Sequence, residues 1–178
     1  MPKKKQKAKP QVSKLDLGCG PHPKEGFTGV DIMDFGQDIV ADLRKRWPWK
    51  DGSIEEVHCS HTVEHFTGEE RIHFFNELYR VLKPDGKCTM IVPHWASVRA
   101  YGDVTHQWPP ISEMFFYYLT KAWRDGNAPH VPFTCNFETT WGYAISPLWQ
   151  TKSQESQQFA ATHYREVIAD TIATLIRK

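Results

Sequence analysis

Short apolar runs separated by turn residues dominate the first half of the chain, and each has the length of a buried strand. These runs cover residues 13–17, 27–32, 38–41 and 54–59. Over 69–82 the apolar residues recur at helical spacing, and the breaker Pro84-Asp85-Gly86 follows. Another apolar run over 87–92 stops at Pro93. Strands that alternate with a helix or with crossover loops predict an α/β fold with a mainly parallel sheet.

The pattern changes after Pro93. Residues 94–132 are rich in aromatic residues, Pro and His, and we expect one helix within 111–123 and a strand over 133–145. The last segment fits a helix or a strand. We predict a helix to about Arg165 and then a closing strand, because β-branched residues are frequent near the end. Residues 13–178 are expected to form a single domain, in which 94–132 is a lid or insertion on the substrate side.

Composition narrows the class of protein. The chain has 178 residues, which suits one domain, and no run approaches the roughly 18 apolar residues of a membrane span. No apolar signal segment follows the first methionine. The four cysteines lie far apart, which favours reduced thiols in a cytoplasmic protein.

The net charge of +1 is unevenly distributed, because Met1 to Lys9 holds five lysines and no acid. The rest of the chain has 17 basic against 21 acidic residues. We expect residues 1–12 to be a disordered basic tail, and a nucleic-acid-binding arm is the alternative. The acidic balance of the remainder does not support that alternative, so no specific nucleic-acid binding is expected.

Two acids and a glycine turn carry the first chemical signal. The run that ends in Asp16 leads into Gly18-Cys19-Gly20, and the next run ends in Asp31. Ligands of open α/β sheets bind outside the carboxyl ends of the strands, and glycine lets the backbone approach them closely. The Asp31 carboxylate can accept hydrogen bonds from both hydroxyls of an adenosine ribose. Asp42, after the third run, can accept from the adenine amino group. The simpler alternative is that both acids only end strands or cap turns.

The residues after the turn do not suit a dinucleotide. A pyrophosphate needs backbone N–H groups at a helix N-terminus, but this stretch reads Pro21-His22-Pro23, and proline has no N–H. A ligand with adenosine and no phosphate fits better, and S-adenosylmethionine is such a ligand.

Several motifs in order carry a family resemblance. They are Leu15-Asp-Leu-Gly-Cys-Gly20, Gly29-Val-Asp-Ile32, Ala41-Asp-Leu43, Asp51-Gly-Ser53, Ser60-His-Thr-Val-Glu-His65 and Val81-Leu-Lys-Pro-Asp-Gly86. The chain resembles the class I S-adenosylmethionine-dependent methyltransferases, in particular a small bacterial and phage group, similar to methyltransferase type 11, with a shortened first helix. The match covers about 13–93, and Asp103-Val-Thr-His106 extends it.

The resemblance implies a Rossmann-like, mainly parallel seven-stranded sheet with an antiparallel last strand. It also implies that the chain is an enzyme that transfers the sulfonium methyl of S-adenosylmethionine to an unidentified small-molecule or protein acceptor. The cofactor-binding residues would be Asp16, Gly18, Cys19 and Gly20 at the methionine part, Asp31 and Ile32 at the ribose, Asp42 and Leu43 at adenine, and Ser60 and His61 near the sulfonium. The family's usual third turn glycine is absent, and His22 lies near its place.

Methyl transfer needs a base only when the acceptor must lose a proton. His94, Asp103 and His106 follow the fifth predicted strand and are the candidate catalytic residues. The alternative is that they organise the loop.

Two other functions stay open. His61-Thr-Val-Glu-His65 matches the H-x-x-E-H pattern of zinc hydrolases, but it directly follows a strand and Thr67-Gly68 interrupts it. We therefore predict no metal. The third reading is a protein that binds the cofactor or a partner without catalysis, with Phe115 to Tyr118 packing in the core or stacking on a planar ligand.

Overall fold

The computed structural model of the chain describes residues 12–178. The predicted basic tail of residues 1–12 falls almost entirely outside this range. None of the helices within the described range is long and apolar enough to cross a bilayer.

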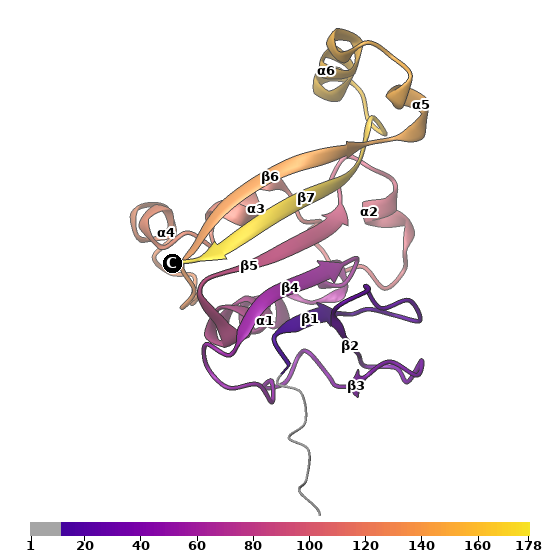
Figure 1. Cartoon of the computed structure of the whole chain (residues 1–178). Coiled ribbons are helices and arrows are strands. Elements are labelled where there is room, and N and C mark those ends of the chain that lie inside the picture. Colours follow the sequence, from indigo (N-terminus) through magenta and orange to yellow (C-terminus); the bar gives the residue numbers. More distant parts are fainter. Residues whose placement is uncertain (1–11) are drawn as a thin grey trace, which may run out of the picture.

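A single seven-stranded sheet in the order β3-β2-β1-β4-β5-β7-β6 forms the centre of the fold (Figure 1). The strands are β1 (Lys14–Leu17), β2 (Thr28–Asp31), β3 (Ile39–Val40), β4 (Ile54–Ser60), β5 (Leu82–Pro93), β6 (Phe137–Ile145) and β7 (Ile168–Arg177). The first five pair in parallel, whereas β7 lies antiparallel between β5 and β6. The predicted α/β class, the seven strands and the antiparallel last strand are confirmed.

Helices gather on one face of this sheet (Figure 1). The longest is α1 (Gly68–Val81), which connects β4 to β5, and the short helix η1 (Val63–His65) precedes it. The remaining helices are α2 (Arg99–Gly102), α3 (Glu113–Tyr117), α4 (Lys121–Asn127), α5 (Pro147–Gln150) and α6 (Gln154–His163). Of these, α5 and α6 project from the sheet between β6 and β7 (Figure 1).

Strand alternation explains why one face is covered and the other is not. In β4, Val57 and Cys59 are fully buried against the helical face, whereas Glu56, His58 and Ser60 on the other face are only partly buried. Lys14 and Lys87 flank Glu56 on neighbouring strands and form ion pairs with it, at 2.8 and 3.2 Å. Such polar side chains can remain in contact with water. This face of the sheet therefore needs no covering helix, as the alternating pattern indicates.

The connections from β1 to β2 and from β2 to β3 contain no helix, and the first of them includes the glycine turn. Residues 18–27 join β1 to β2 as turns, and residues 32–38 join β2 to β3 in the same way. Gly29 N–H donates to Asp38 at 2.8 Å and Lys24 N–H donates to Asp16 at 2.8 Å, so side-chain carboxylates fix these connections. The carboxyl edge of the sheet therefore stays open above β1 and β2.

Several predicted boundaries are wrong. Strand β5 begins at Leu82 and not at Lys87, because Leu82 pairs with Ile54 before a bulge that includes Asp85 at φ 59°. The third strand shrinks to two residues, and β6 begins at Phe137 and not at residue 133. Two short helices, α3 and α4, replace the one expected within 111–123. In the last segment the strand prediction is confirmed, since β7 runs from Ile168 to Arg177.

Candidate functional site

The turn after β1 adopts the left-handed conformation that favours glycine. Gly18 has φ +69° and Gly20 has φ +56°. The two positions differ in their surroundings, because a Cβ on Gly18 would lie 2.1 Å from the Thr62 hydroxyl oxygen, whereas one on Gly20 would meet nothing within 4 Å. The Thr62 hydroxyl in turn donates to the carbonyl oxygens of Leu17 and Ser60, at 3.2 and 3.1 Å. The turn is thus packed tightly against the end of β4.

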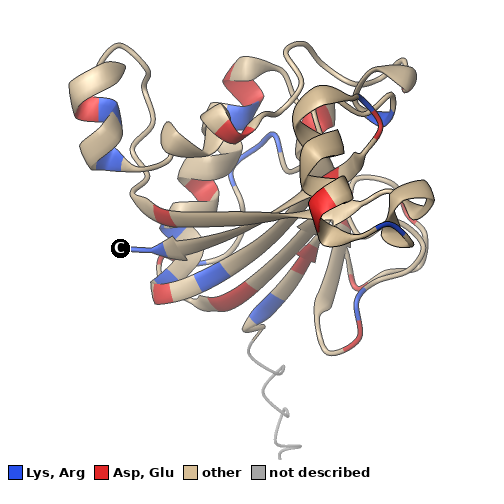
Figure 2. Cartoon of the chain, turned by 90° about the horizontal axis from the view of Figure 1, so that it is seen from above, with Lys and Arg blue, Asp and Glu red and all other residues tan. Residues whose placement is uncertain are grey.

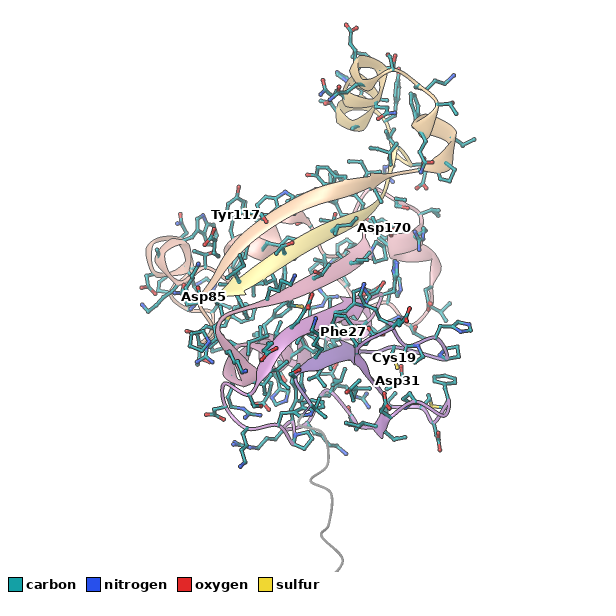
Figure 3. The ribbon with its side chains drawn as sticks, in the orientation of Figure 1. Cys19, Phe27, Asp31, Asp85, Tyr117 and Asp170 are labelled. Atoms are coloured by element: carbon teal, nitrogen blue, oxygen red, sulfur yellow. The ribbon has the colours of Figure 1, made fainter. Side chains whose placement is uncertain are left out.

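Asp31 connects this turn to the loop after β2. Its carboxylate accepts the N–H of Gly20 at 2.9 Å and the N–H of Met33 at 3.0 Å. The two bonds use one lone pair on each oxygen and leave the others for a ligand. Figure 3 shows Asp31 close to Cys19 at the arrowhead ends of β1 and β2, at the opposite edge of the sheet from Asp85.

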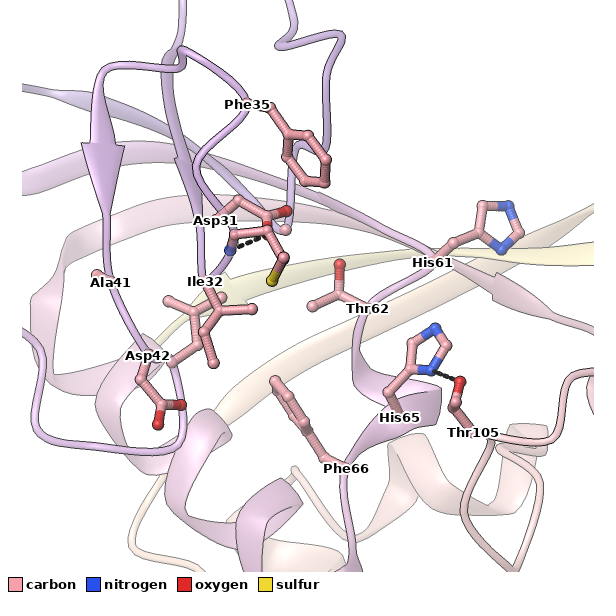
Figure 4. A pocket seen from close by; sticks show the side chains of 13 residues that line it. Asp31, Ile32, Phe35, Ala41, Asp42, His61, Thr62, His65, Phe66 and Thr105 are labelled. Atoms are coloured by element: carbon pink, nitrogen blue, oxygen red, sulfur yellow. Dashed lines mark hydrogen bonds between the residues drawn. The ribbon is translucent and has the colours of Figure 1, made fainter.

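A first pocket of about 630 Å³ opens beside Asp31 (Figure 4). Its walls come from residues at or just after the ends of β1, β2, β3 and β4, from the residue after η1 and from the loop after α2. The lining residues are Gly18, Asp31, Ile32, Met33, Phe35, Ala41, Asp42, Leu43, His61, Thr62, His65, Phe66 and Thr105. The wall is mostly apolar, and the Asp31 carboxylate keeps lone pairs that can accept hydrogen bonds from a ligand. This combination suits a ligand with a flat ring and a polar sugar.

Six of the ten residues expected at the cofactor line this pocket: Gly18, Asp31, Ile32, Asp42, Leu43 and His61. The other four, Asp16, Cys19, Gly20 and Ser60, lie just outside the lining. Asp16 is buried and accepts from His58 Nδ1 at 2.7 Å, so its carboxylate fixes β1 to β4. Arg44 donates to the Asp42 carboxylate at 2.8 Å, and this hydrogen bond lowers the pKa of Asp42.

A second pocket of about 540 Å³ adjoins the first, and His61 and His65 line both. Arg99, Asp103 and His106 of the loop around α2 form its outer wall. Of the predicted lid over 94–132, only residues within 98–106 line the two pockets. The helix α3 lies instead between α1 and β6, with Phe116 fully buried and Phe115 against Phe75.

His61 has a strained backbone at φ 52°, which is uncommon for a residue with a side chain. This conformation turns the chain sharply from β4 into η1. The His61 ring makes a hydrogen bond through Nδ1 to Glu64 at 3.2 Å, and its Nε2 lies 3.8 Å from an Asp170 oxygen. His61 therefore stands between the two pockets, with Nδ1 bonded to Glu64 and Nε2 close to both Asp170 and the Arg99 guanidinium, which lies 3.5 Å away.

The three candidate catalytic residues fall in different places. His106 and Asp103 line the second pocket, and Asp103 accepts from the backbone N–H and the hydroxyl of Thr105, at 2.8 and 2.6 Å. The Thr105 hydroxyl bond is the main cause of a lowered pKa at Asp103. His94 is buried and makes a 3.1 Å bond through Nε2 to Glu113. His94 lines neither pocket, and its role as a base stays a prediction that its buried position does not favour.

The zinc-hydrolase reading of residues 61–65 lacks its required helix. His61 lies outside any helix at positive φ, and η1 has only three residues. The two histidines therefore do not stand one turn apart on one helical face, as the H-x-x-E-H pattern needs.

The prediction from sequence missed seven lining residues: Met33, Phe35, Ala41, Thr62, His65, Phe66 and Thr105. One signal could have identified two of them. Met33 and Phe35 are large apolar residues directly after a strand that ends in the ribose-binding candidate Asp31, and both stay half exposed. No comparable signal exists for Thr105, because its place depends on how the loop after β5 folds back.

Part of the chain is similar in sequence to a known protein domain. Residues 22–90 match the family model of the methyltransferase domain. An uncharacterised 37.1 kDa protein in a transposon of Streptomyces fradiae is 28% identical over 115 residues. That match covers 51% of this chain, and it spans about a third, 33%, of the relative.

Solved structures show the same fold. An S-adenosylmethionine-dependent methyltransferase from Archaeoglobus fulgidus superposes with a TM-score of 0.67 at 19% identity, over 94% of this chain and 86% of that one. The geranyl diphosphate C-methyltransferase from Streptomyces coelicolor, solved with Mg²⁺, geranyl diphosphate and S-adenosylhomocysteine, gives 0.56 at 15% identity, over 96% and 72%. Residues 22–90 are thus similar to a methyltransferase domain, and the strand order and the superposition show that the chain has the fold of S-adenosylmethionine-dependent methyltransferases of known structure.

Proposed function

We propose that the chain binds S-adenosylmethionine in the first pocket and transfers its methyl group to an acceptor in the second. The observation that carries this proposal is the pair of adjoining pockets that share His61 and His65. A cofactor with its ribose at Asp31 and its adenine near Asp42 and Leu43 would direct its sulfonium toward this shared wall.

The chemistry needs mainly positioning. An acceptor atom forms a bond to the methyl carbon as the carbon–sulfur bond breaks, and the sulfur keeps the electron pair, so that the charged sulfonium becomes a neutral thioether. Holding both reactants in line and excluding water supply most of the acceleration. The apolar wall formed by Ile32, Met33 and Phe66 supports water exclusion at the cofactor.

The acceptor class stays open as a small molecule or a protein side chain. Acidic and basic positions are interspersed along the ribbon in the view of Figure 2, and the chain after Lys9 has 17 basic against 21 acidic residues, which gives a polyanion such as nucleic acid little net attraction. We accordingly continue to expect no specific nucleic-acid binding.

Calorimetry with S-adenosylhomocysteine tests the binding step. We expect Asp31→Ala to weaken the affinity by roughly tenfold to hundredfold, because charge-assisted hydrogen bonds to the ribose are lost. Asp34→Ala is the matched control, since Asp34 is an exposed acid on the same loop that accepts only from Gly36 at 3.0 Å. ATP should bind far more weakly than S-adenosylhomocysteine, because Pro21 and Pro23 give its phosphates no N–H donors.

Absence of heat and of a thermal shift with millimolar S-adenosylhomocysteine would refute the proposal. Catalysis needs a separate assay, in which radiolabelled methyl from S-adenosylmethionine is followed into a panel of small molecules and proteins. Tight binding without transfer to any member of that panel would favour the alternative of a non-catalytic cofactor-binding protein.

A further inference from the structure

Three potential metal ligands meet in the second pocket, and one of them, His65, also lines the first. One carboxylate oxygen of Glu64 and one ring nitrogen each of His65 and His106 all lie within 4.8 Å of one another. The two rings pack edge to face with centroids 4.7 Å apart. From this geometry we infer that Glu64, His65 and His106, which all line the second pocket, form a binding site for a first-row divalent metal ion.

The Glu64 carboxylate is the strongest indication of a ligand. The residue is buried, with 4% of its surface exposed, and its Oε2 atom has no hydrogen-bond partner. Its other oxygen is already used, because His61 Nδ1 lies 3.2 Å from Oε1. A buried carboxylate oxygen without a partner is costly, and native proteins usually satisfy such a group with a donor, a water molecule or an ion.

Both histidines are held in the way that metal ligands usually are. His65 Nδ1 lies 2.8 Å from the Thr105 hydroxyl, which itself donates to Asp103 at 2.6 Å. The Thr105 oxygen therefore accepts a hydrogen bond from the Nδ1–H of His65, which leaves Nε2 of that ring with a free lone pair. The dashed line in Figure 4 marks this bond between His65 and Thr105. Such a donation from the second ring nitrogen orients ligating histidines and raises their basicity.

His106 shows the same arrangement. Its Nδ1 faces the carbonyl oxygen of Ala100 at 3.3 Å, and a carbonyl can only accept. The proton of the neutral ring is thus on Nδ1, and Nε2 is again free to bind a metal. Two histidines with free Nε2 atoms and one carboxylate oxygen are a donor set that suits Zn²⁺, Fe²⁺ or Co²⁺ better than Mg²⁺.

Hydrogen bonds to backbone carbonyls hold the segment with His106 against η1, the short helix that contains Glu64 and His65. Gln107 N–H donates to the Glu64 carbonyl at 2.9 Å, directly next to His106. The buried guanidinium of Arg71 donates to the carbonyls of Val63 and Gln107, at 3.2 and 3.1 Å. Because these bonds are to backbone oxygens, the approach of residues 106–107 to η1 does not depend on a bound ion.

Three protein ligands leave coordination positions open toward the second pocket. If the proposed methyl transfer holds, an oxygen of the acceptor can occupy such a position and be held close to the methyl group. This role rests on the proposed function, whereas metal binding itself does not, so the two can be tested apart.

The test uses the full chain without cofactor, titrated with Zn²⁺ by calorimetry and with Co²⁺ by visible absorption, and Mg²⁺ serves as the weak-binding comparison. We expect equimolar binding and a Co²⁺ spectrum. His65→Ala, His106→Ala and Glu64→Gln should each weaken binding by at least about tenfold. Thr105→Val should weaken it by roughly tenfold to hundredfold, because His65 loses its orienting acceptor.

His130→Ala is the matched control, since His130 is an exposed histidine outside both pockets, and it should bind metal as the unaltered chain does. Urea denaturation of each variant verifies the fold independently of either ligand, because His65 and Thr105 also line the first pocket. If Zn²⁺ and Co²⁺ do not bind, or if His106→Ala and Thr105→Val bind them as tightly as His130→Ala, the metal site is wrong. Metal binding without S-adenosylhomocysteine binding would instead overturn the proposed function and leave the site intact.

Discussion

Gly18 and Asp31 illustrate how single residues shape the first pocket. Gly18 brings the backbone of the turn against Thr62, and Asp31 fixes the same turn through the N–H of Gly20. Replacement of either residue changes the pocket wall directly, but the physical causes differ. At Gly18 a larger side chain would clash with Thr62. At Asp31 a replacement would remove the acceptor for the N–H of Gly20.

The comparison of Gly18→Ala with Gly20→Ala isolates the effect of space. Both glycines have positive φ, so each alanine costs about 1–2 kcal/mol in backbone strain. Only the alanine at 18 collides with Thr62, which adds about 1–3 kcal/mol of overpacking. Urea denaturation should therefore show a clearly larger loss of unfolding free energy for Gly18→Ala. Equal losses in the two variants would mean that Thr62 moves aside freely.

Among the elements, α1 and the loops around it determine where the site residues meet. The helix begins with a capping box, in which Thr67 and Glu70 each satisfy the other's backbone N–H. Arg71 in its first turns then binds carbonyls of the preceding η1 and of residues 107 and 109. A polar contact fixes the end of β5 against α3 in a similar way, because buried His94 makes a 3.1 Å hydrogen bond to Glu113.

The contact between His94 and Glu113 predicts a pH dependence of stability. The hydrogen bond from His94 is the main reason that the pKa of Glu113 falls from 4.5 to about 2. A carboxylate whose pKa is lowered by folding stabilises the protein above the unfolded pKa, and this contribution is lost as the pH falls from about 4.5 to about 2.

Denaturation of Glu113→Gln and the unaltered chain measures this contribution. We expect the variant to be less stable by about 1.5–3 kcal/mol near neutral pH, with the difference shrinking below about pH 4.5. Glu25→Gln, at an exposed carboxylate in the connection between β1 and β2, should show no comparable difference at either pH. A difference for Glu113→Gln that persists unchanged in acid would assign the effect to packing.

At the scale of the whole molecule, the sheet separates a helical face from an open face (Figure 1). The pockets lie at the carboxyl edge, where ligands of such sheets bind. Within residues 12–178, all of their lining residues fall between Gly18 and His106.

Deletion of Met1 to Lys9 should therefore leave S-adenosylhomocysteine affinity within about twofold of the full chain. Calorimetry on the two proteins measures this. Gel shifts with nucleic acid at low and high salt are the companion measurement, because binding through lysines falls steeply with salt. We expect no specific shift for either protein, and a shift that disappears with the deletion would establish the nucleic-acid alternative for the five lysines.

Local patterns determined much of this protein in advance. Alternating apolar runs and turn residues predicted β1, β2 and β4 to within two residues at each end, because strand length, burial and glycine conformations are properties of neighbouring residues. Asp31 was identified for the same reason, since a residue that ends a parallel strand must lie at the carboxyl edge. The predicted starts of β5 and β6 were wrong, because a bulge in β5 and the long loop before β6 determine where these strands begin.

Only the tertiary structure decided how distant segments meet. The sequence shows Glu64, His65 and His106 as separate polar residues, and it favoured His61 and His65 as the pair in any metal site. In the fold, His61 contacts Glu64 and Asp170 and does not pair with His65, while Arg71 and the Gln107 N–H bring the loop after α2 against η1. These are hydrogen bonds to backbone carbonyls, which every residue carries, so no pattern of side chains along the chain could have indicated them.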